Sequence, residues 1–300
     1  MKIGFIGTHP LLEQLFRIDQ KGYDVVGVYS HSSPDSLAGV RVYSTASALV
    51  QESDVIFMGQ TAPAPFETGK LAVKGSRHLF LESPFALEAG QLDELYRLAA
   101  ESQSMVKLNQ RLLHHPVYRY LEKSLHPGQV FIRMDAAGQN GPDDKMHELW
   151  FELSSLLCGT IPSGIRRTGS HVVIPSVDLE GPVACQAHVD FDNGASAMVL
   201  VNHLAESESL QAEFFQQEGR YLMDFFAGKA LSFRSTDTKA QKVEKESPSW
   251  HSLTVEAFRA WTEAANNGKL PLTLNEQGQA VYHLAGQLLD KLQQRRRLLV

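Results

Sequence analysis

From Lys2 to Asn109 the chain alternates between short apolar runs and segments whose apolar residues recur at helical spacing. The runs have the length of buried strands, and each segment between two runs is long enough for a helix or a tight connection. This alternation predicts an α/β protein that begins with a Rossmann-type, doubly wound parallel sheet. The expected strands are 2–7, 23–30, 39–43, 54–59, 79–82 and 105–109, and the expected helices are 11–18, 47–51, 66–74 and 89–100.

The strand expected at 79–82 has a proline close behind it. Ligands of an open parallel sheet bind just beyond the carboxyl ends of its strands. Glu82, Ser83 and Pro84 are therefore expected at the mouth of a cofactor cleft.

Composition narrows the classes of protein to which the chain can belong. It has 28 Lys and Arg against 34 Asp and Glu, a net charge of −6. Nucleic-acid binders neutralise phosphates with basic residues, so a nucleic-acid partner is not expected. Cys158 and Cys185 stand in no metal-type spacing, which indicates a reduced, cytoplasmic protein without a metal site. No apolar run approaches the roughly 18 residues of a membrane span, and the N-terminal run is too short for a secretion signal.

The turn after the first expected strand departs from the glycine pattern of dinucleotide-binding loops. That pattern, G-x-G-x-x-G, lets the backbone approach the pyrophosphate closely. Here Gly7 is in register, whereas His9 and Leu12 occupy the second and third glycine positions. Two interpretations stay open: a modified loop in which Thr8 or His9 faces phosphate, or a phosphate site that has been lost.

The end of the second expected strand bears on the choice of cofactor. Proteins that prefer NAD place a carboxylate there, on the ribose 2′-hydroxyl. Ser30 and His31 offer none, so nothing repels a 2′-phosphate. If a dinucleotide binds, this favours NADP over NAD.

Several stretches in a fixed order carry a family resemblance. They are 54–58, 69–72, 78–84 and 109–111 followed by His115 and Pro116, then a period-two run at 183–191, a hairpin turn at Asp192-Asn193-Gly194, a partner strand at 195–204, a second hairpin over 213–225, and helical segments at 255–265 and the C-terminus. In order and spacing they resemble the Gfo/Idh/MocA oxidoreductases, the group of glucose–fructose oxidoreductase and inositol dehydrogenase.

The resemblance implies two domains. Residues 1–116 would form the dinucleotide-binding domain. Residues 117–300 would form a substrate and oligomerisation domain with a large, open, mainly antiparallel sheet, through which a homodimer or homotetramer would assemble. The cofactor would be NADP or NAD, and its expected contacts are Gly7, Thr8, His9, Ser30, His31, Gln60, Glu82, Pro84, Asn109 and Arg111.

The residues of the expected catalytic site depart from the family pattern. Ser83 stands where the family has the Lys of Glu-Lys-Pro, and a hydroxyl can only exchange hydrogen bonds there. The family's Asp-x-x-x-His spacing is present as Asp143 and His147. Counting back from the end of the helix at 158–159 instead puts Leu149 in the histidine position, so His147 is either the acid/base or the histidine has been lost.

Two functions are compatible with these observations. The first is an NAD(P)-dependent oxidoreductase that transfers hydride to or from a small carbonyl, carbinol or imine substrate, with His147, His114 or His115 as proton donor. Asn109, Arg111 and the two neighbouring histidines form a cluster that suits a polar or anionic ligand. The alternative is a non-catalytic regulatory or scaffold protein on the same fold that has lost catalysis.

Overall fold

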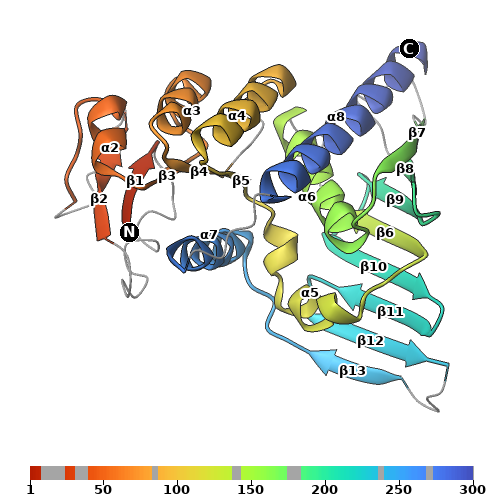
Figure 1. Ribbon diagram of the computed structural model, residues 1–300. Coiled ribbons are helices and arrows are strands. Elements are labelled where there is room, and N and C mark those ends of the chain that lie inside the picture. Colours follow the sequence, from red (N-terminus) through yellow and green to blue (C-terminus); the bar gives the residue numbers. More distant parts are fainter. Residues whose placement is uncertain are drawn as a thin grey trace. The chain divides into compact units, whose positions relative to one another are not determined.

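The computed structural model describes residues 1–7, 24–30, 40–82, 87–136, 143–173, 184–235, 240–267 and 273–299 (Figure 1). The side chains of 143–145, 273–275 and 295–299 are not described. The predicted helix at 11–18 and the predicted site residues Thr8, His9, His31, Ser83 and Pro84 lie outside these ranges, as does the side chain of Asp143.

The chain divides into two compact units, each built from two segments. Unit 1 comprises Met1–Gln110 and Trp250–Tyr282, and unit 2 comprises Arg111–Ser249 and His283–Val300. The sequence predicted one boundary, after residue 116. In the structure the segment 250–282 also belongs to unit 1, because it packs there although it follows unit 2's strands in the sequence.

Unit 1 contains a parallel sheet of five described strands in the order β2-β1-β3-β4-β5. The strands are β1 (Lys2–Ile6), β2 (Asp24–Tyr29), β3 (Val55–Met58), β4 (His78–Leu81) and β5 (Val106–Leu108). The helices are α2 (Ala46–Glu52), α3 (Pro65–Lys74), α4 (Ala89–Ser102), α7 (Trp250–Asn266) and the first part of α8 (Thr273–Leu299). The predicted parallel sheet is confirmed.

The strand predicted at 39–43 was wrong. Only Val42 pairs with the sheet, as an isolated bridge to Val28. The Val28 N–H donates to Arg41 O at 2.9 Å, and the Tyr43 N–H donates to Val28 O at 2.8 Å. Pairing stops there because Thr45 already caps α2, its hydroxyl accepting the Ala48 N–H at 3.2 Å.

Helix α7 packs on the sheet of unit 1 through an aromatic cluster. The Phe258 ring lies edge-on to Phe57 and Phe80, with centroids 5.0 and 5.1 Å apart. Trp261 joins the same buried cluster. On the opposite face, Gly69 of α3 lies against Leu79, where a Cβ would come within 3.3 Å of the leucine side chain. Both faces of the sheet are therefore covered, which explains its continuous apolar strands.

Unit 2 is built on a sheet of eight described strands in the order β13-β12-β11-β10-β6-β9-β8-β7. Among these strands only β6 and β9 pair in parallel, and the other pairs are antiparallel. The predicted mainly antiparallel sheet is therefore confirmed. The strands are β6 (Gln129–Asp135), β7 (Ile165–Val173), β8 (Ala184–Phe191), β9 (Ser196–Asn202), β10 (Ser209–Gln216), β11 (Gly219–Asp224), β12 (Lys229–Arg234) and β13 (Gln241–Glu244). Both predicted hairpins are present, and Gly194 adopts the positive φ of +85° that its turn needs.

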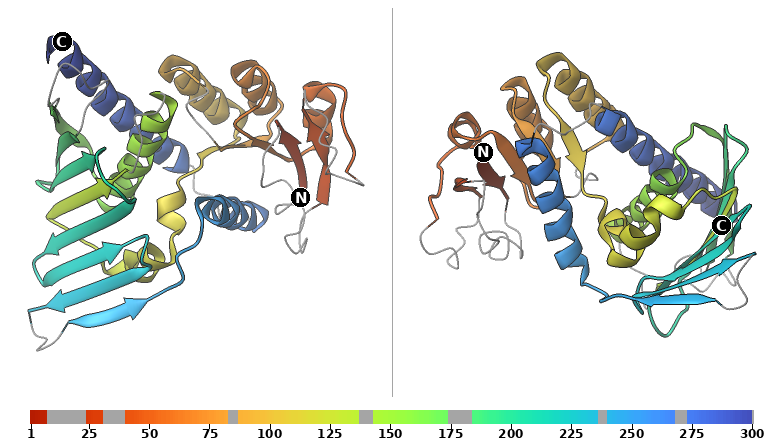
Figure 2. Two further views of the ribbon diagram at one scale, coloured as in Figure 1. Left: turned by 180° about the vertical axis from the view of Figure 1, so that it is seen from behind. Right: turned by 60° about the horizontal axis from the view of Figure 1, so that its bottom comes forward.

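The helices that the structure describes in unit 2 lie on one face of this sheet, as the views in Figures 1 and 2 show. They are η2 (Arg111–His114), α5 (Pro116–Leu121), η3 (Glu122–Ser124), α6 (Asp143–Thr160) and the second part of α8. Lys291 of α8 donates to both the carbonyl and the hydroxyl of Thr168 on β7 at 2.6 Å. The strands alternate between buried and half-exposed residues, so one sheet face forms the core and the other stays open.

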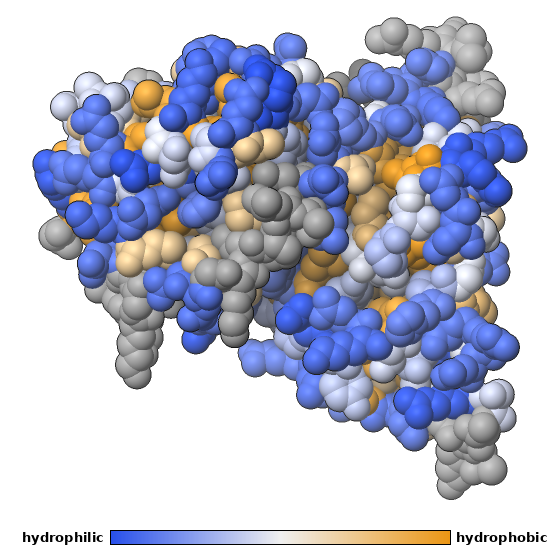
Figure 3. Space-filling model, viewed as in Figure 1, coloured by the Kyte–Doolittle hydropathy of each residue, from blue (hydrophilic) through white to orange (hydrophobic). Residues whose placement is uncertain are grey.

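None of the helices within the described ranges combines the length and the apolar character needed to cross a bilayer. In the space-filling view, polar residues cover most of the surface and apolar residues gather over strands of the second sheet (Figure 3).

Candidate functional site

The carboxyl ends of the parallel strands of unit 1 bring five predicted site residues to one edge of the sheet. Backbone bonds hold these ends together: the Gly7 N–H donates to Tyr29 O at 2.9 Å, and the Asn109 N–H donates to Leu81 O at 2.9 Å. Ligands of open α/β sheets bind at this edge. The residues that follow the strands are Gly7, Ser30, Gln60, Glu82 and Asn109.

Gly7 is required by the backbone at the end of β1. Its φ is +86°, a conformation that residues with a side chain rarely adopt. A Cβ at this position would lie 2.7 Å from the backbone nitrogen of Ala62, in the turn after β3. Gly7 therefore has the tight turn expected of the first glycine of a dinucleotide-binding loop.

Glu82 connects two of the strand ends. Its carboxylate, in a residue only 8% exposed, accepts the backbone N–H of Gln60 at 3.2 Å. The bond fixes the loop after β3 against the end of β4. Two residues predicted from sequence as cofactor contacts are thus brought together, and Glu82 positions the loop that carries Gln60.

Asn109 is fixed by a residue far away in the chain. Its side-chain amide donates to the Thr254 hydroxyl of α7 at 3.0 Å, and both residues are 2% exposed. The amide oxygen Oδ1 is buried without a hydrogen-bond partner. At the carboxyl edge of the sheet, this oxygen is an acceptor that a ligand donor can satisfy.

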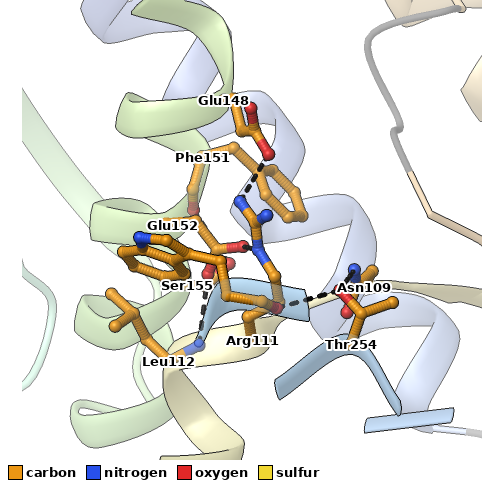
Figure 4. A network of polar contacts seen from close by, with 9 residues as sticks. Asn109, Arg111, Leu112, Glu148, Phe151, Glu152, Ser155 and Thr254 are labelled. Atoms are coloured by element: carbon orange, nitrogen blue, oxygen red, sulfur yellow. Dashed lines mark hydrogen bonds and ion pairs between the residues drawn. The ribbon is translucent and has the colours of Figure 1, made fainter. Parts of the chain in front are cut away.

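Arg111 of unit 2 lies between two carboxylates one turn apart on α6 (Figure 4). Its Nη2 contacts Glu148, and its Nε donates to Glu152 Oε1 at 2.7 Å. The second oxygen of Glu152 accepts the Leu112 N–H at 3.2 Å. Burial raises the pKa of Glu152, and the Arg111 charge opposes that rise. The guanidinium, predicted as a cofactor contact, stays positively charged, and two carboxylates within unit 2 already pair with it.

Sequence reasoning missed Glu148 and Glu152. A signal was available, since two carboxylates four residues apart share one helix face and can hold a single guanidinium. The sequence does not show which arginine the two glutamates bind.

The expected acid/base pair lies at the start of α6. Asp143 is the first residue of that helix, and His147 stands one turn later, half-buried. Leu149, which stands in the histidine position in the other register, is 9% exposed and belongs to the core. The spacing from Asp143 to His147 is therefore realised in a helix, and their role in catalysis stays a prediction.

His115 is the N-cap residue of α5. Its Nδ1 accepts the Val117 N–H at 3.2 Å, and its ring meets Phe225 edge-on. Burial lowers the pKa of His115 to about 4, an effect that the Phe225 backbone opposes. The ring is thus neutral, and one nitrogen caps the helix. The neutral ring of His115 and the ion-paired Arg111 do not favour an anionic ligand, and the binding of a polar ligand by the predicted cluster stays a prediction.

The residues described at the edge of the parallel sheet fit a dinucleotide. Gly7 provides the turn at the end of β1, and Asn109 provides a buried acceptor. Ser30 follows β2 without bringing a carboxylate to the ribose position. Within the described ranges, no three His, Cys, Asp or Glu side chains gather as metal ligands.

Comparison with protein families supports a dinucleotide-binding fold for the first unit. Residues 1–110 match the model of an oxidoreductase family with an NAD-binding Rossmann fold. A curated relative, the UDP-N-acetylglucosamine 3-dehydrogenase of Acidithiobacillus ferrooxidans, is 21% identical over 194 residues. The match covers 62% of this chain and 60% of that protein, so it spans less than two thirds of the relative.

Solved structures share the whole fold. A structure of the same Acidithiobacillus ferrooxidans dehydrogenase has a TM-score of 0.83 at 16% identity and covers 98% of both chains. Biliverdin reductase of Synechocystis sp. PCC 6803, solved with biliverdin and NADP+, has a TM-score of 0.70 at 16% identity over 97% of this chain and 98% of that one. GenD2 from gentamicin A biosynthesis, solved with NAD, has a TM-score of 0.73 at 14% identity over 97% and 93%.

Proposed function

We propose that this chain, whose residues 1–110 belong to the Gfo/Idh/MocA oxidoreductase family, is an NAD(P)-dependent oxidoreductase acting on a small carbonyl, carbinol or imine substrate. A bound nicotinamide supplies or accepts the hydride. The observation that carries the proposal is Gly7, whose positive φ and close approach to Ala62 provide a dinucleotide turn at the carboxyl edge of the parallel sheet.

NADP is the cofactor that we propose. Ser30 follows β2 and brings no carboxylate that would repel a 2′-phosphate. Similar folds hold either cofactor, since biliverdin reductase was solved with NADP+ and GenD2 with NAD. Only the residues at the end of β2 therefore favour one cofactor over the other.

His147 is the proposed proton donor and acceptor. It stands on α6, one turn after Asp143, so both positions face the same side of the helix. Ser83 stands two residues after the end of β4 in the sequence, and a serine hydroxyl can exchange hydrogen bonds but cannot act as an acid near neutral pH. The proton is thus assigned to the imidazole.

UDP-N-acetylglucosamine is the first substrate to test. The support is the sequence match to its 3-dehydrogenase, which extends beyond the Rossmann domain because it covers 62% of this chain. The reaction would convert one carbinol carbon of the sugar to a carbonyl.

Titration with NADPH and with NADH, followed by the fluorescence of the reduced nicotinamide, tests the proposal. We expect saturable binding, tighter for NADPH, and reduction of NADP+ with UDP-N-acetylglucosamine that falls at least about 100-fold in His147→Ala. No binding of either cofactor at millimolar concentration would overturn the proposed function. Undiminished turnover in His147→Ala would remove that residue from the reaction.

We also propose that a second copy of the chain covers the open face of the second sheet. The registers place one row of five side chains across that face, and four of the five are apolar. Apolar surface that other parts of the chain leave open often marks an interface. A two-fold axis would let the same row meet itself. Leu222→Lys should convert a dimer or tetramer to a smaller species in light scattering; an unchanged mass would reject this surface. The row is Met198, Phe131, Glu213, Leu222 and Leu231.

A further inference from the structure

His203 is a buried histidine to which the fold gives no hydrogen bond. It follows β9 directly and is 4% exposed, yet neither Nδ1 nor Nε2 has a partner. It is the one residue within the described ranges that buries two unpartnered side-chain nitrogens. Buried polar groups in folded proteins are almost always paired, so the two ring nitrogens of His203 need a partner that the fold itself does not provide.

The strand register places His203 at a definite point of unit 2. Asn202 pairs with Asp135, and the Ala136 N–H donates to Asn202 O at 2.8 Å, which extends the parallel ladder by one step. His203 therefore lies beside the small, fully buried Ala136. The alternation along β9 puts it on the same face as Val199 and Val201, which is the helix-covered face.

The start of α6 lies at the same end of the sheet. Strand β7 is antiparallel to β8, and β8 is antiparallel to β9, so β7 runs parallel to β6. Helix α6 connects these two parallel strands and must run back across the sheet between them. Its first turns, which carry His147, thus begin at the carboxyl end of β6, where Ala136 and His203 lie.

The chemistry of the ring indicates the kind of ligand group. Burial lowers the pKa of His203, so its imidazole is neutral and has one N–H donor and one acceptor nitrogen. A hydroxyl group also donates and accepts, and it can satisfy either tautomer. A phosphate or carboxylate only accepts, so it can take the ring N–H but leaves the acceptor nitrogen of the neutral ring without a donor.

We propose that His203 is a substrate-contacting residue that hydrogen-bonds a hydroxyl group of the substrate at the carboxyl end of β9, on the side of the sheet where α6 begins. This inference rests on the proposed function and deepens it, because it assigns to His203 the recognition of a hydroxylated substrate and leaves proton transfer to His147.

Ring NMR of the NADPH-bound protein tests the contact directly. The Cε1–H signal of His203 is assigned by its absence from His203→Gln and is followed during titration with N-acetylglucosamine, UDP and UDP-N-acetylglucosamine. We expect the two sugars to move the signal and UDP alone to leave it in place. A signal that neither sugar moves at millimolar concentration would overturn the inference, whereas absence of NADPH binding would overturn the proposed function instead.

Two variants separate recognition from packing. His203→Leu should bind NADPH as the wild type does and melt at an equal or higher temperature, because an unpaired polar group is removed. Its KM for UDP-N-acetylglucosamine should rise about tenfold or more, and His203→Gln, with a donor and an acceptor, should recover most of the loss. Wild-type KM in His203→Leu, or a collapse of its melting temperature, would show that the residue only packs.

Discussion

Glu152 of α6 holds two successive residues of η2 at once: one carboxylate oxygen accepts Nε of Arg111 at 2.7 Å, and the other accepts the backbone N–H of Leu112 at 3.2 Å. Glu152 is 3% exposed, so this contact lies in the core of unit 2. The second carboxylate on Arg111, that of Glu148, is 43% exposed. The two glutamates therefore share one partner in different surroundings.

This difference predicts unequal costs for the same substitution. Glu152→Gln removes the charge that faces a guanidinium only 14% exposed, and we expect it to lower the free energy of unfolding by about 1.5–3 kcal/mol. Glu148→Gln is the matched control and should cost less than about 1 kcal/mol, because solvent screens that pair. Urea unfolding of both variants measures the difference. Equal losses would mean that Glu152 contributes no more than a surface ion pair.

Gly7→Ala should destabilise unit 1 and weaken NADPH binding together. The variant strains a φ of +86° and brings a Cβ to 2.7 Å from Ala62 N, so we expect a loss of about 1–3 kcal/mol or more. Gly90→Ala is the control, because a Cβ there, in the first turn of α4, meets nothing within 4 Å. It should stabilise the protein by about 0.4–1 kcal/mol and leave NADPH binding unchanged. Thermal unfolding and fluorescence titration test both; wild-type behaviour of Gly7→Ala would remove Gly7 as the cofactor turn.

The sequence predicted what depends on local periodicity and on turn chemistry. The strands of the parallel sheet follow from their apolar runs, and the β8–β9 hairpin follows from Asn193 and Gly194. The strand at 39–43 failed because its apolar residues are followed too soon by the cap of α2 at Thr45. Next to β2, too few residues remain before α2 to form a strand, although the apolar pattern of 39–43 is typical of one.

The sequence predicted which residues lie at the ends of the parallel strands, but it did not predict which side chains those residues contact. Gly7, Glu82 and Asn109 were expected at strand ends because each follows an apolar run, and the structure places them there. The partner of Asn109 is Thr254, 145 residues away, and the partners of Arg111 lie on a helix that local patterns do not connect to it. Such contacts come from tertiary packing, which neither spacing nor propensity contains.

Acid should destabilise the protein partly through His115. Its pKa is about 4 in the folded state and about 6.5 in an unfolded chain, so the unfolded state binds more protons between these values. The stability that the neutral ring contributes is thus complete above about pH 6.5 and is lost as the pH falls towards 4. We expect a loss of about 1–2 kcal/mol by about pH 5.

His115→Asn tests this dependence. Asparagine can accept the Val117 N–H as a helix cap but has no proton to gain in this range. Its free energy of unfolding should fall less than that of the wild type between about pH 7 and about pH 5. Parallel pH curves for the two proteins would show that His115 does not take part.

Helix α7 should be needed for the folding of unit 1, although it follows the second sheet in the sequence. Phe258 is 3% exposed and touches the rings of Phe57 and Phe80, so Phe258→Ala should cost about 3–5 kcal/mol. Leu71→Ala, at a position of α3 that is 39% exposed, should cost less than about 1 kcal/mol.

A fragment of residues 1–116 sharpens the same prediction. It contains the described strands of the parallel sheet and lacks α7, so Phe5, Phe57 and Phe80 would face water. We expect the fragment to give poorly dispersed proton NMR spectra and to be cleaved rapidly by protease, and we expect a fragment that appends residues 250–282 through a flexible linker to be protected. A stable, well-dispersed fragment 1–116 would show that the first 116 residues fold independently and that α7 is an addition to their surface.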